Sequence, residues 1–195
     1  MRKIFLALAA LCATAIAIAP VAPAVFAPAW AQFEIEFNKP IVTAVEQGDA
    51  NKVKLLLLRG ESPNQSDKRG WSILIVATAL GYADVADVLL QGGALTEAID
   101  EFGNTALLRA ADHDDADLAG VLLKYRAKIN AQNRQGTTAL MIAARRGATG
   151  LVDVLIRNKA DVNKTDYTGR TALTFAKQNR KTAVARLIEK AGGKE

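Results

Sequence analysis

Apolar and polar positions along this chain follow a pattern that repeats every 33 residues. One apolar series at this spacing comprises Leu56, Leu89, Leu122, Leu155 and Ile188. A second series, one position earlier in each copy, comprises Leu55, Val88, Val121, Val154 and Leu187. A constant period of this length is typical of stacked supersecondary units that share one continuous core, rather than of a domain with a single centre.

Each unit has the pattern of a helix, a tight turn, a second helix and an extended loop, most clearly over residues 136–164. A glycine opens each of the later units, at Gly70, Gly103, Gly136 and Gly169. One period before Gly70 the chain has Phe37, so a degenerate first copy is expected there, with helices near Pro40–Gln47 and Asn51–Arg59. The sequence therefore predicts five copies, over residues 34–66, 67–99, 100–132, 133–165 and 166–195.

The fourth copy carries a recognisable set of residues. These are Gly136, Thr138, Leu140, Ala143, Ala144, Gly147, Ala160, Asp161, Val162 and Asn163. On these residues the unit resembles the ankyrin repeat, and the match covers nearly all of the chain after residue 33. The resemblance implies an all-α, ankyrin-type solenoid of stacked helix-turn-helix repeats with β-turn or hairpin loops between them.

Two departures from the family pattern concern the glycine that follows the second helix of each copy. It is present as Gly60, Gly93 and Gly192, but Arg126 and Lys159 replace it in the third and fourth copies. If both residues keep the left-handed backbone that the glycine provides, each costs roughly 1 to 2 kcal/mol of stability. Lys159→Gly is therefore predicted to stabilise the protein.

The N-terminal residues have a different character from the repeats. Arg2 and Lys3 precede an uncharged apolar run over residues 4–19, and small residues stand at Ala29 and Ala31. This layout predicts a secretory signal peptide over residues 1–31, cleaved after Ala31, and a periplasmic repeat domain over residues 32–195. An uncleaved membrane anchor is the alternative, but the apolar run is short for a span and prolines interrupt its extension.

Removal of residues 1–31 changes what composition implies. The only cysteine, Cys12, is lost, and 23 basic against 20 acidic residues remain, a net charge of +3. The mature chain then has no thiol for a disulfide or a nucleophile, and its charge is too modest to indicate nucleic-acid binding. The sequence also lacks a nucleophile elbow, a P-loop, an HExxH motif and a dinucleotide fingerprint. We therefore expect a protein that is not an enzyme and needs no cofactor. We also expect it to be a monomer.

The family resemblance implies a partner-binding concave face, made of loop tips and the exposed sides of the first helices. Transferred to this chain, the candidate partner-binding residues are Arg69, Trp71, Phe102, Asn104, Asp112, His113, Arg134, Arg145, Arg146, Tyr167 and Arg170. Aromatic residues and Arg commonly dominate interface energetics. Acidic residues crowd the third copy and arginines the next two, a change of sign that would orient a complementary partner. For Trp71 the alternative is local packing against the next loop.

The sequence thus favours an exported scaffold or regulator that binds another protein, whose identity it does not specify. A binder of the inhibitor or immunity type is a second possibility of the same class. The alternative from another class is a metal-dependent enzyme built on the acidic run at residues 112–117, where His113 and four aspartates stand close in sequence.

Overall fold

The computed structural model describes residues 39–195; the predicted signal peptide lies outside this range. The described part contains ten α-helices and no strand longer than an isolated bridge. The helices are α3 (Pro40–Glu46), α4 (Ala50–Leu58), α5 (Ile73–Ala79), α6 (Ala83–Gln91), α7 (Ala106–Asp112), α8 (Ala116–Lys124), α9 (Ala139–Arg146), α10 (Thr149–Arg157), α11 (Ala172–Gln178) and α12 (Thr182–Lys190). The all-α prediction is confirmed.

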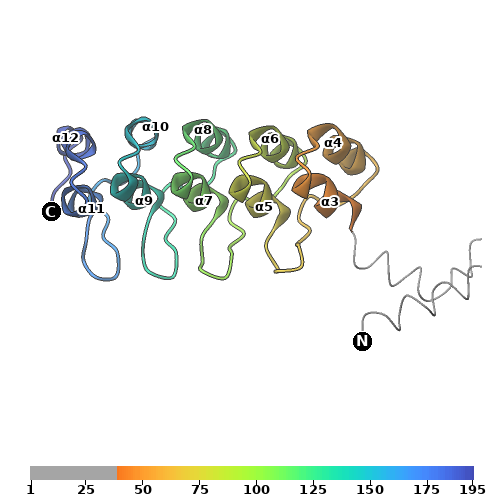
Figure 1. Ribbon diagram of the computed structural model, residues 1–195, viewed down its shortest axis with the longest axis horizontal. Coiled ribbons are helices and arrows are strands. Elements are labelled where there is room, and N and C mark those ends of the chain that lie inside the picture. The colour runs from red at the N-terminus through yellow and green to blue at the C-terminus, as the bar shows by residue number, and fades with distance from the viewer. Residues whose placement is uncertain (1–38) are drawn as a thin grey trace, which may run out of the picture. The chain divides into compact units, whose positions relative to one another are not determined.

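The helices of residues 39–195 form two layers, as Figure 1 shows. The first helix of each copy lies in one layer, in the order α3, α5, α7, α9 and α11, and the second helix of each copy lies in the other. Each helix packs on the other helix of its copy and on the equivalent helix of the neighbouring copies. Hairpin loops between copies extend from the first layer, away from the second (Figure 1).

The predicted aliphatic series forms the contact between the layers. Leu89, Leu122, Leu155 and Ile188 are fully buried, and Leu56 in the first copy is nearly so. Burying a side chain of this size contributes about 1.5 to 3 kcal/mol, so one short helix pair gains too little to fold alone. The series instead builds one apolar core that runs through all the described copies.

The first helix of most copies begins at a hydroxyl side chain. Ser72 accepts from the Ile75 N–H of α5, and Thr138 accepts from the Met141 N–H of α9, both at 3.3 Å. Thr171 makes the equivalent 3.3 Å bond at α11. Such caps satisfy an amide that the helix itself leaves unpaired, each contributing about 1 kcal/mol.

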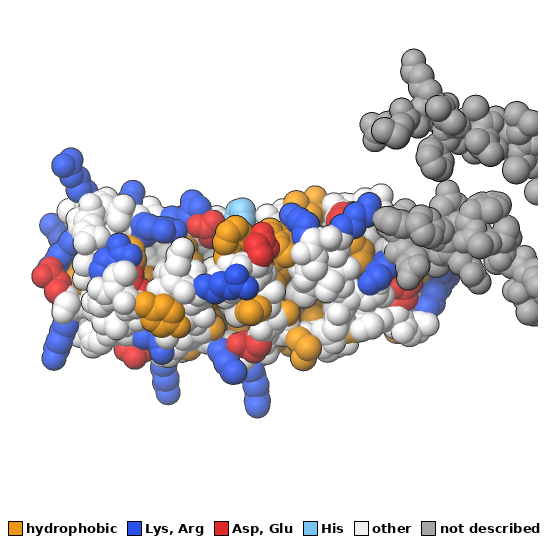
Figure 2. Space-filling view, turned by 90° about the horizontal axis from the view of Figure 1, so that it is seen from below, with side chains coloured by type: hydrophobic (Ala, Val, Ile, Leu, Met, Phe, Trp, Pro, Cys, Tyr) orange, Lys and Arg blue, Asp and Glu red, His pale blue; other side chains and the backbone are white. Residues whose placement is uncertain are grey.

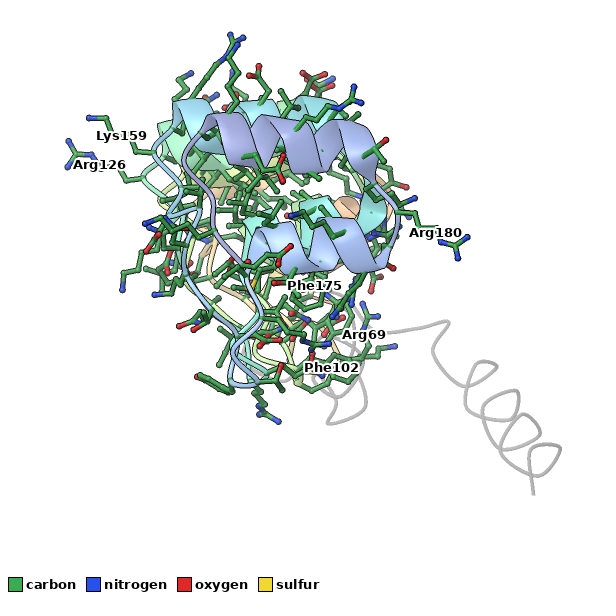
Figure 3. The ribbon with its side chains drawn as sticks, turned by 90° about the vertical axis from the view of Figure 1, so that its left-hand side faces the viewer. Arg69, Phe102, Arg126, Lys159, Phe175 and Arg180 are labelled. Atoms are coloured by element: carbon green, nitrogen blue, oxygen red, sulfur yellow. The ribbon has the colours of Figure 1, made fainter. Side chains whose placement is uncertain are left out.

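The left-handed backbone expected at Arg126 and Lys159 is present, with φ of 62° and 66°. Two further residues have it, Asp114 (φ 56°) and Arg180 (φ 57°), in the turn between the helices of their copies. Glycines occupy the equivalent turn in the other copies. Viewed along the array, Arg126 and Lys159 project from one edge and Arg180 from the opposite edge (Figure 3).

A ladder of polar side chains, in the loops that follow the second helix of each copy, joins successive copies. Asn64, Glu97, Asn130 and Asn163 each accept the backbone N–H of a residue 31 positions later, at Leu95, Lys128, Asp161 and Lys194 respectively. These bonds are 2.8 to 2.9 Å long. They fix the spacing of neighbouring loops.

Within residues 39–195, no helix has both the length and the apolar character needed to cross a membrane.

Candidate functional site

The hairpin tips are stabilised by the acidic or amide residue that opens each of them. Asp100 Oδ1 accepts the backbone N–H groups of Phe102 and Asn104, both at 2.8 Å, and its own carbonyl accepts from Gly103. Asp67, Asn133 and Asp166 make the same pair of bonds in their copies. An Asx side chain that accepts from two backbone amides stabilises a tight turn locally. The tips are therefore rigid.

Neighbouring tips also bind one another through their backbones. Arg134 N–H donates to the Phe102 carbonyl, and Tyr167 N–H donates to the Gln135 carbonyl, both at 3.2 Å. The approach is so close that a Cβ on Gly136 would lie 2.7 Å from the Tyr167 nitrogen, so only glycine fits there. We call the row of tips (residues 67–71, 100–104, 133–137 and 166–170), together with the exposed ends of α7 and α9, the tip face. Figure 2 looks onto this side, where Lys and Arg side chains surround smaller apolar areas.

Trp71 does not project from the tip face. Only 8% of it is exposed, and two guanidinium groups lie over its ring, with the Arg69 Cζ at 3.9 Å and the Arg109 Cζ at 4.7 Å from the ring centroid. The indole N–H donates to the carboxylate of Glu101 on the next tip. The structure therefore supports the alternative of local packing for this residue: Trp71 joins the second and third copies.

Arg109 is the other half of this cluster. Its Nε donates to Asp100 Oδ2 at 2.7 Å, and its Cζ lies 5.9 Å from the centroid of the Phe102 ring. Burial alone would raise the pKa of Asp100, but the hydrogen bonds from Asn104, Phe102 and Arg109 together hold that pKa below its usual value. The carboxylate is thus charged, and its oxygens accept hydrogen bonds from within the fold.

Sequence reasoning did not select Arg109, although the repeat contains a signal for it. The equivalent positions of the other copies hold Thr43, Val76, Ile142 and Phe175, so Arg109 is the single charged member of its series. Val76, Ile142 and Phe175 are buried, and 17% of the Arg109 side chain is exposed. A charge at a core position requires a partner, which here is the turn-forming Asp100.

The acidic run at residues 112–117 contains the residues that end α7 and begin α8. Asp115 caps α8 by accepting the Leu118 N–H at 2.9 Å, and exposed His113 ends α7. Asp112 Oδ1 accepts from Arg146, with Nη2 at 2.9 Å and Nε at 3.1 Å, and lies 3.9 Å from Arg145 Nη2. Where the charge along the tips was predicted to change sign, Asp112 and Arg146 thus form an ion pair between the third and fourth copies. In the part of the chain that the structure describes, no three acidic, His or Cys residues are grouped so as to hold a metal ion.

A pocket of about 170 Å³ opens on the tip face between the third and fourth copies. Ten residues of both copies line it: Phe102, Asn104, Leu108, Arg109, Asp112, Asn133, Gln135, Thr137, Ile142 and Arg145. The pocket therefore brings together four of the predicted site residues, namely Phe102, Asn104, Asp112 and Arg145. Gln135 and Thr137 also belong to the concave face that the family resemblance implies, whereas Arg109 was not predicted. In the view along the array, Arg69 and Phe102 lie on the hairpin side of the helices (Figure 3).

The remaining predicted residues lie outside this pocket. Arg134 is exposed on the fourth tip, and Tyr167 is 73% exposed on the fifth. Arg69 pairs with Asp67 at 2.8 Å, and Arg170 pairs with Asp166 at 2.9 Å and lies over the Phe175 ring. Burial would raise the pKa of Asp166, but hydrogen bonds from Thr168 and Arg170 lower it to about 2. Both arginines thus partly stabilise their own turns.

Comparison with known families gives a match over most of the chain. A family model described as ankyrin repeats (3 copies) matches residues 41–133 and again residues 129–194. The two matches together span all ten helices of the described part apart from the first residue of α3. No curated protein matches the chain.

Proposed function

Because the chain belongs to the ankyrin repeat family, we propose that it is a non-catalytic module that holds a partner protein on its tip face. Ankyrin repeats generally mediate protein–protein interaction. The finer proposal concerns which surface of this chain makes the contact, and where in the cell it does so.

The observation that carries the proposal is the exposure of two aromatic side chains on a rigid backbone. Phe102 is 58% exposed and Tyr167 is 73% exposed, each on a tip that its Asx residue and its neighbour hold in place. Large exposed aromatic groups on a preorganised surface favour binding, because little conformational entropy is lost when a partner covers them. Half-exposed Arg145, on α9, lines the same pocket as Phe102.

We further propose that the protein acts outside the cytoplasm, as a scaffold or regulator in the periplasm of a Gram-negative cell. The support is the sequence layout of residues 1–31: a basic start, an apolar centre and small residues before Gln32. Mass spectrometry on protein from fractionated cells that express the 195-residue chain tests this. A periplasmic species beginning at Gln32 is expected, and a cytoplasmic species that retains residues 1–31 would refute it.

Affinity capture tests the binding surface. The full chain with a C-terminal tag is expressed, and proteins retained from a periplasmic extract are identified. Variants Phe102→Ser and Tyr167→Ser, combined, remove the exposed rings of the tip face. Leu58→Ser is the matched control, because Leu58 is 78% exposed and lies on α4 in the other layer.

The proposal expects a partner that the unmodified chain and the Leu58→Ser variant retain, and that the double variant loses while its thermal unfolding stays unchanged. Retention by the double variant together with loss by Leu58→Ser would place the contact on the second layer and refute the proposal.

A further inference from the structure

We propose that the pocket between the third and fourth tips is a subsite for a carboxylate, supplied by an Asp or Glu side chain of an extended partner segment that crosses the tip face. This inference rests on the proposed function and names the chemistry of its partner. It follows from three features of the pocket: one uncommitted cation, two uncommitted neutral donors and an apolar wall.

The uncommitted cation is Arg145. Its side chain is 49% exposed, and its ion contact is a 3.9 Å approach of Nη2 to Asp112 Oδ1, too long for a hydrogen bond. Arg146 donates twice to that same oxygen. Because Asp112 is already paired with Arg146, the guanidinium donors of Arg145 are available in the part of the chain that the structure describes.

The other cation of the pocket is committed. Arg109 is bound to Asp100, lies over the rings of Trp71 and Phe102, and is mostly buried. The two pairs, Arg109 with Asp100 and Arg146 with Asp112, are each close to neutral, so Arg145 leaves the pocket positively charged. An anion is therefore the complementary ligand, and a cation would meet Arg145 unfavourably.

Two neutral donors line the same pocket. Among residues 39–195, the side-chain amide of Gln135 and the hydroxyl of Thr137 have no hydrogen-bond partner. The two asparagines beside them are engaged, since Asn133 Oδ1 accepts two backbone amides and its Nδ2 donates to Asn104 at 2.9 Å. A carboxylate has acceptor oxygens and no donor, and it pairs well with a guanidinium and neutral N–H and O–H groups.

The apolar wall and the position of the pocket indicate what carries the carboxylate. Phe102, Leu108 and Ile142 line the pocket, and the 58% exposed Phe102 offers contact to an apolar residue beside the acid. The row of tips continues past the pocket in both directions, to Arg69 in the second copy and Tyr167 in the fifth. A segment that crosses the pocket therefore finds contacts on both sides, which favours an internal acidic side chain over a free C-terminus.

Titration with minimal probes tests the inference directly. N-acetyl-phenylalanyl-aspartate amide is added to the ¹⁵N-labelled chain, and backbone amide shifts are followed by NMR. The neutral isostere N-acetyl-phenylalanyl-asparagine amide is titrated in parallel. We expect the aspartate probe to shift the signals of Gln135, Thr137 and Arg145, and to bind at least about tenfold more tightly than the asparagine probe, as loss of a charged hydrogen bond predicts.

The variant Arg145→Gln is expected to lose that tenfold preference, and Arg180→Gln to keep it. Arg180 is a matched control because it is also an exposed arginine, and it lies at the edge of the array away from the hairpins (Figure 3). No shifts at the pocket, equal binding of the two probes, or an unchanged preference in Arg145→Gln would each overturn the inference.

Two further readings separate the possible outcomes. N-acetyl-phenylalanine carries its carboxylate at the chain end, and equal or tighter binding of this probe than of the aspartate probe would overturn the assignment to an internal side chain. A partner captured equally by the unmodified chain and by Arg145→Gln, yet lost by the double tip variant, would leave the proposed function standing and refute the carboxylate subsite. Specific binding of the aspartate probe without any captured partner would support the carboxylate subsite and refute the proposed function.

Discussion

Arg109 Nε lies 2.7 Å from Asp100 Oδ2, and the guanidinium of this ion pair contacts the rings of Trp71 and Phe102. The pair connects α7 to the tip of its own copy, and Trp71 connects it to the copy before. The orientation of the third tip, which carries exposed Phe102, therefore depends on a charged group at a position that is apolar in three other copies.

Asp100→Ala is expected to lower the free energy of unfolding by about 3 to 5 kcal/mol, because it leaves Arg109 partly buried without its partner and removes the acceptor of two tip amides. Arg109→Met is expected to cost less, about 1 to 2 kcal/mol, since Asp100 keeps its bonds to Phe102 and Asn104. Urea unfolding of both variants measures the difference. Equal losses would contradict this arrangement of Asp100 and Arg109.

The depressed pKa of Asp166 predicts a loss of stability in acid. Its pKa is about 2 in the folded chain against an ordinary 3.8, so the charged form is favoured by folding. The contribution, on the order of 1 to 2 kcal/mol, is complete above about pH 5 and is lost as the pH falls towards 2. Asp166→Asn should unfold more easily than the unmodified chain at pH 7, and the two should converge near pH 2.

Asn133 makes the equivalent turn in the fourth copy, so Asp166→Asn keeps the turn and removes the charge. Urea unfolding at pH 7 and pH 2.5 provides the measurement. A difference between the two proteins that does not shrink at the lower pH would show that the charge of Asp166 is not the cause.

Lys159→Gly is expected to raise the free energy of unfolding by about 1 kcal/mol, because Lys159 has a φ of 66° that glycine adopts without strain. The preceding residue is the control: Asn158 has a φ of −87°, so Asn158→Gly should give no gain. Thermal unfolding of both variants tests the prediction. A stabilised Asn158→Gly or an unchanged Lys159→Gly would contradict it.

The ladder between copies predicts the cost of losing one of its bonds. Asn130 Oδ1 accepts the Asp161 N–H at 2.9 Å, and Asn130→Leu removes the acceptor at an expected cost of about 0.5 to 1.5 kcal/mol. Asn130→Asp keeps an acceptor, as Glu97 does in the preceding copy, and should cost less. Amide hydrogen exchange at Asp161 gives a local readout. Protection there that is unchanged in Asn130→Leu would refute the role assigned to the ladder.

The 33-residue period of the sequence predicted the architecture because the residues that determine the local structure recur in each copy. The leucine series, the hydroxyl caps and the left-handed positions at Arg126 and Lys159 are all set within one copy. Asp114 and Arg180 were not identified as left-handed, although the other copies have a glycine with positive φ at the equivalent position.

The site was less predictable because its contacts cross between copies. Trp71 and Phe102 are both aromatic residues of hairpin tips, yet one is buried by Arg69 and Arg109 and the other is 58% exposed. The change of sign at Asp112 and Arg146 is a contact between residues 34 positions apart in the chain. Side-chain directions at loop tips depend on the neighbouring copy, which a pattern within one copy does not specify.

Site-specific photo-crosslinking in living cells tests the central claim, that the tip face holds the partner, most directly. Benzoylphenylalanine is incorporated at position 102 on the third tip or at position 58 on α4, where Leu58 is the more exposed of the two residues. We predict a discrete crosslinked partner protein from position 102 and none from position 58. Adducts from position 58 alone would show that the partner contacts the second layer, and would contradict the claim that the tip face holds it.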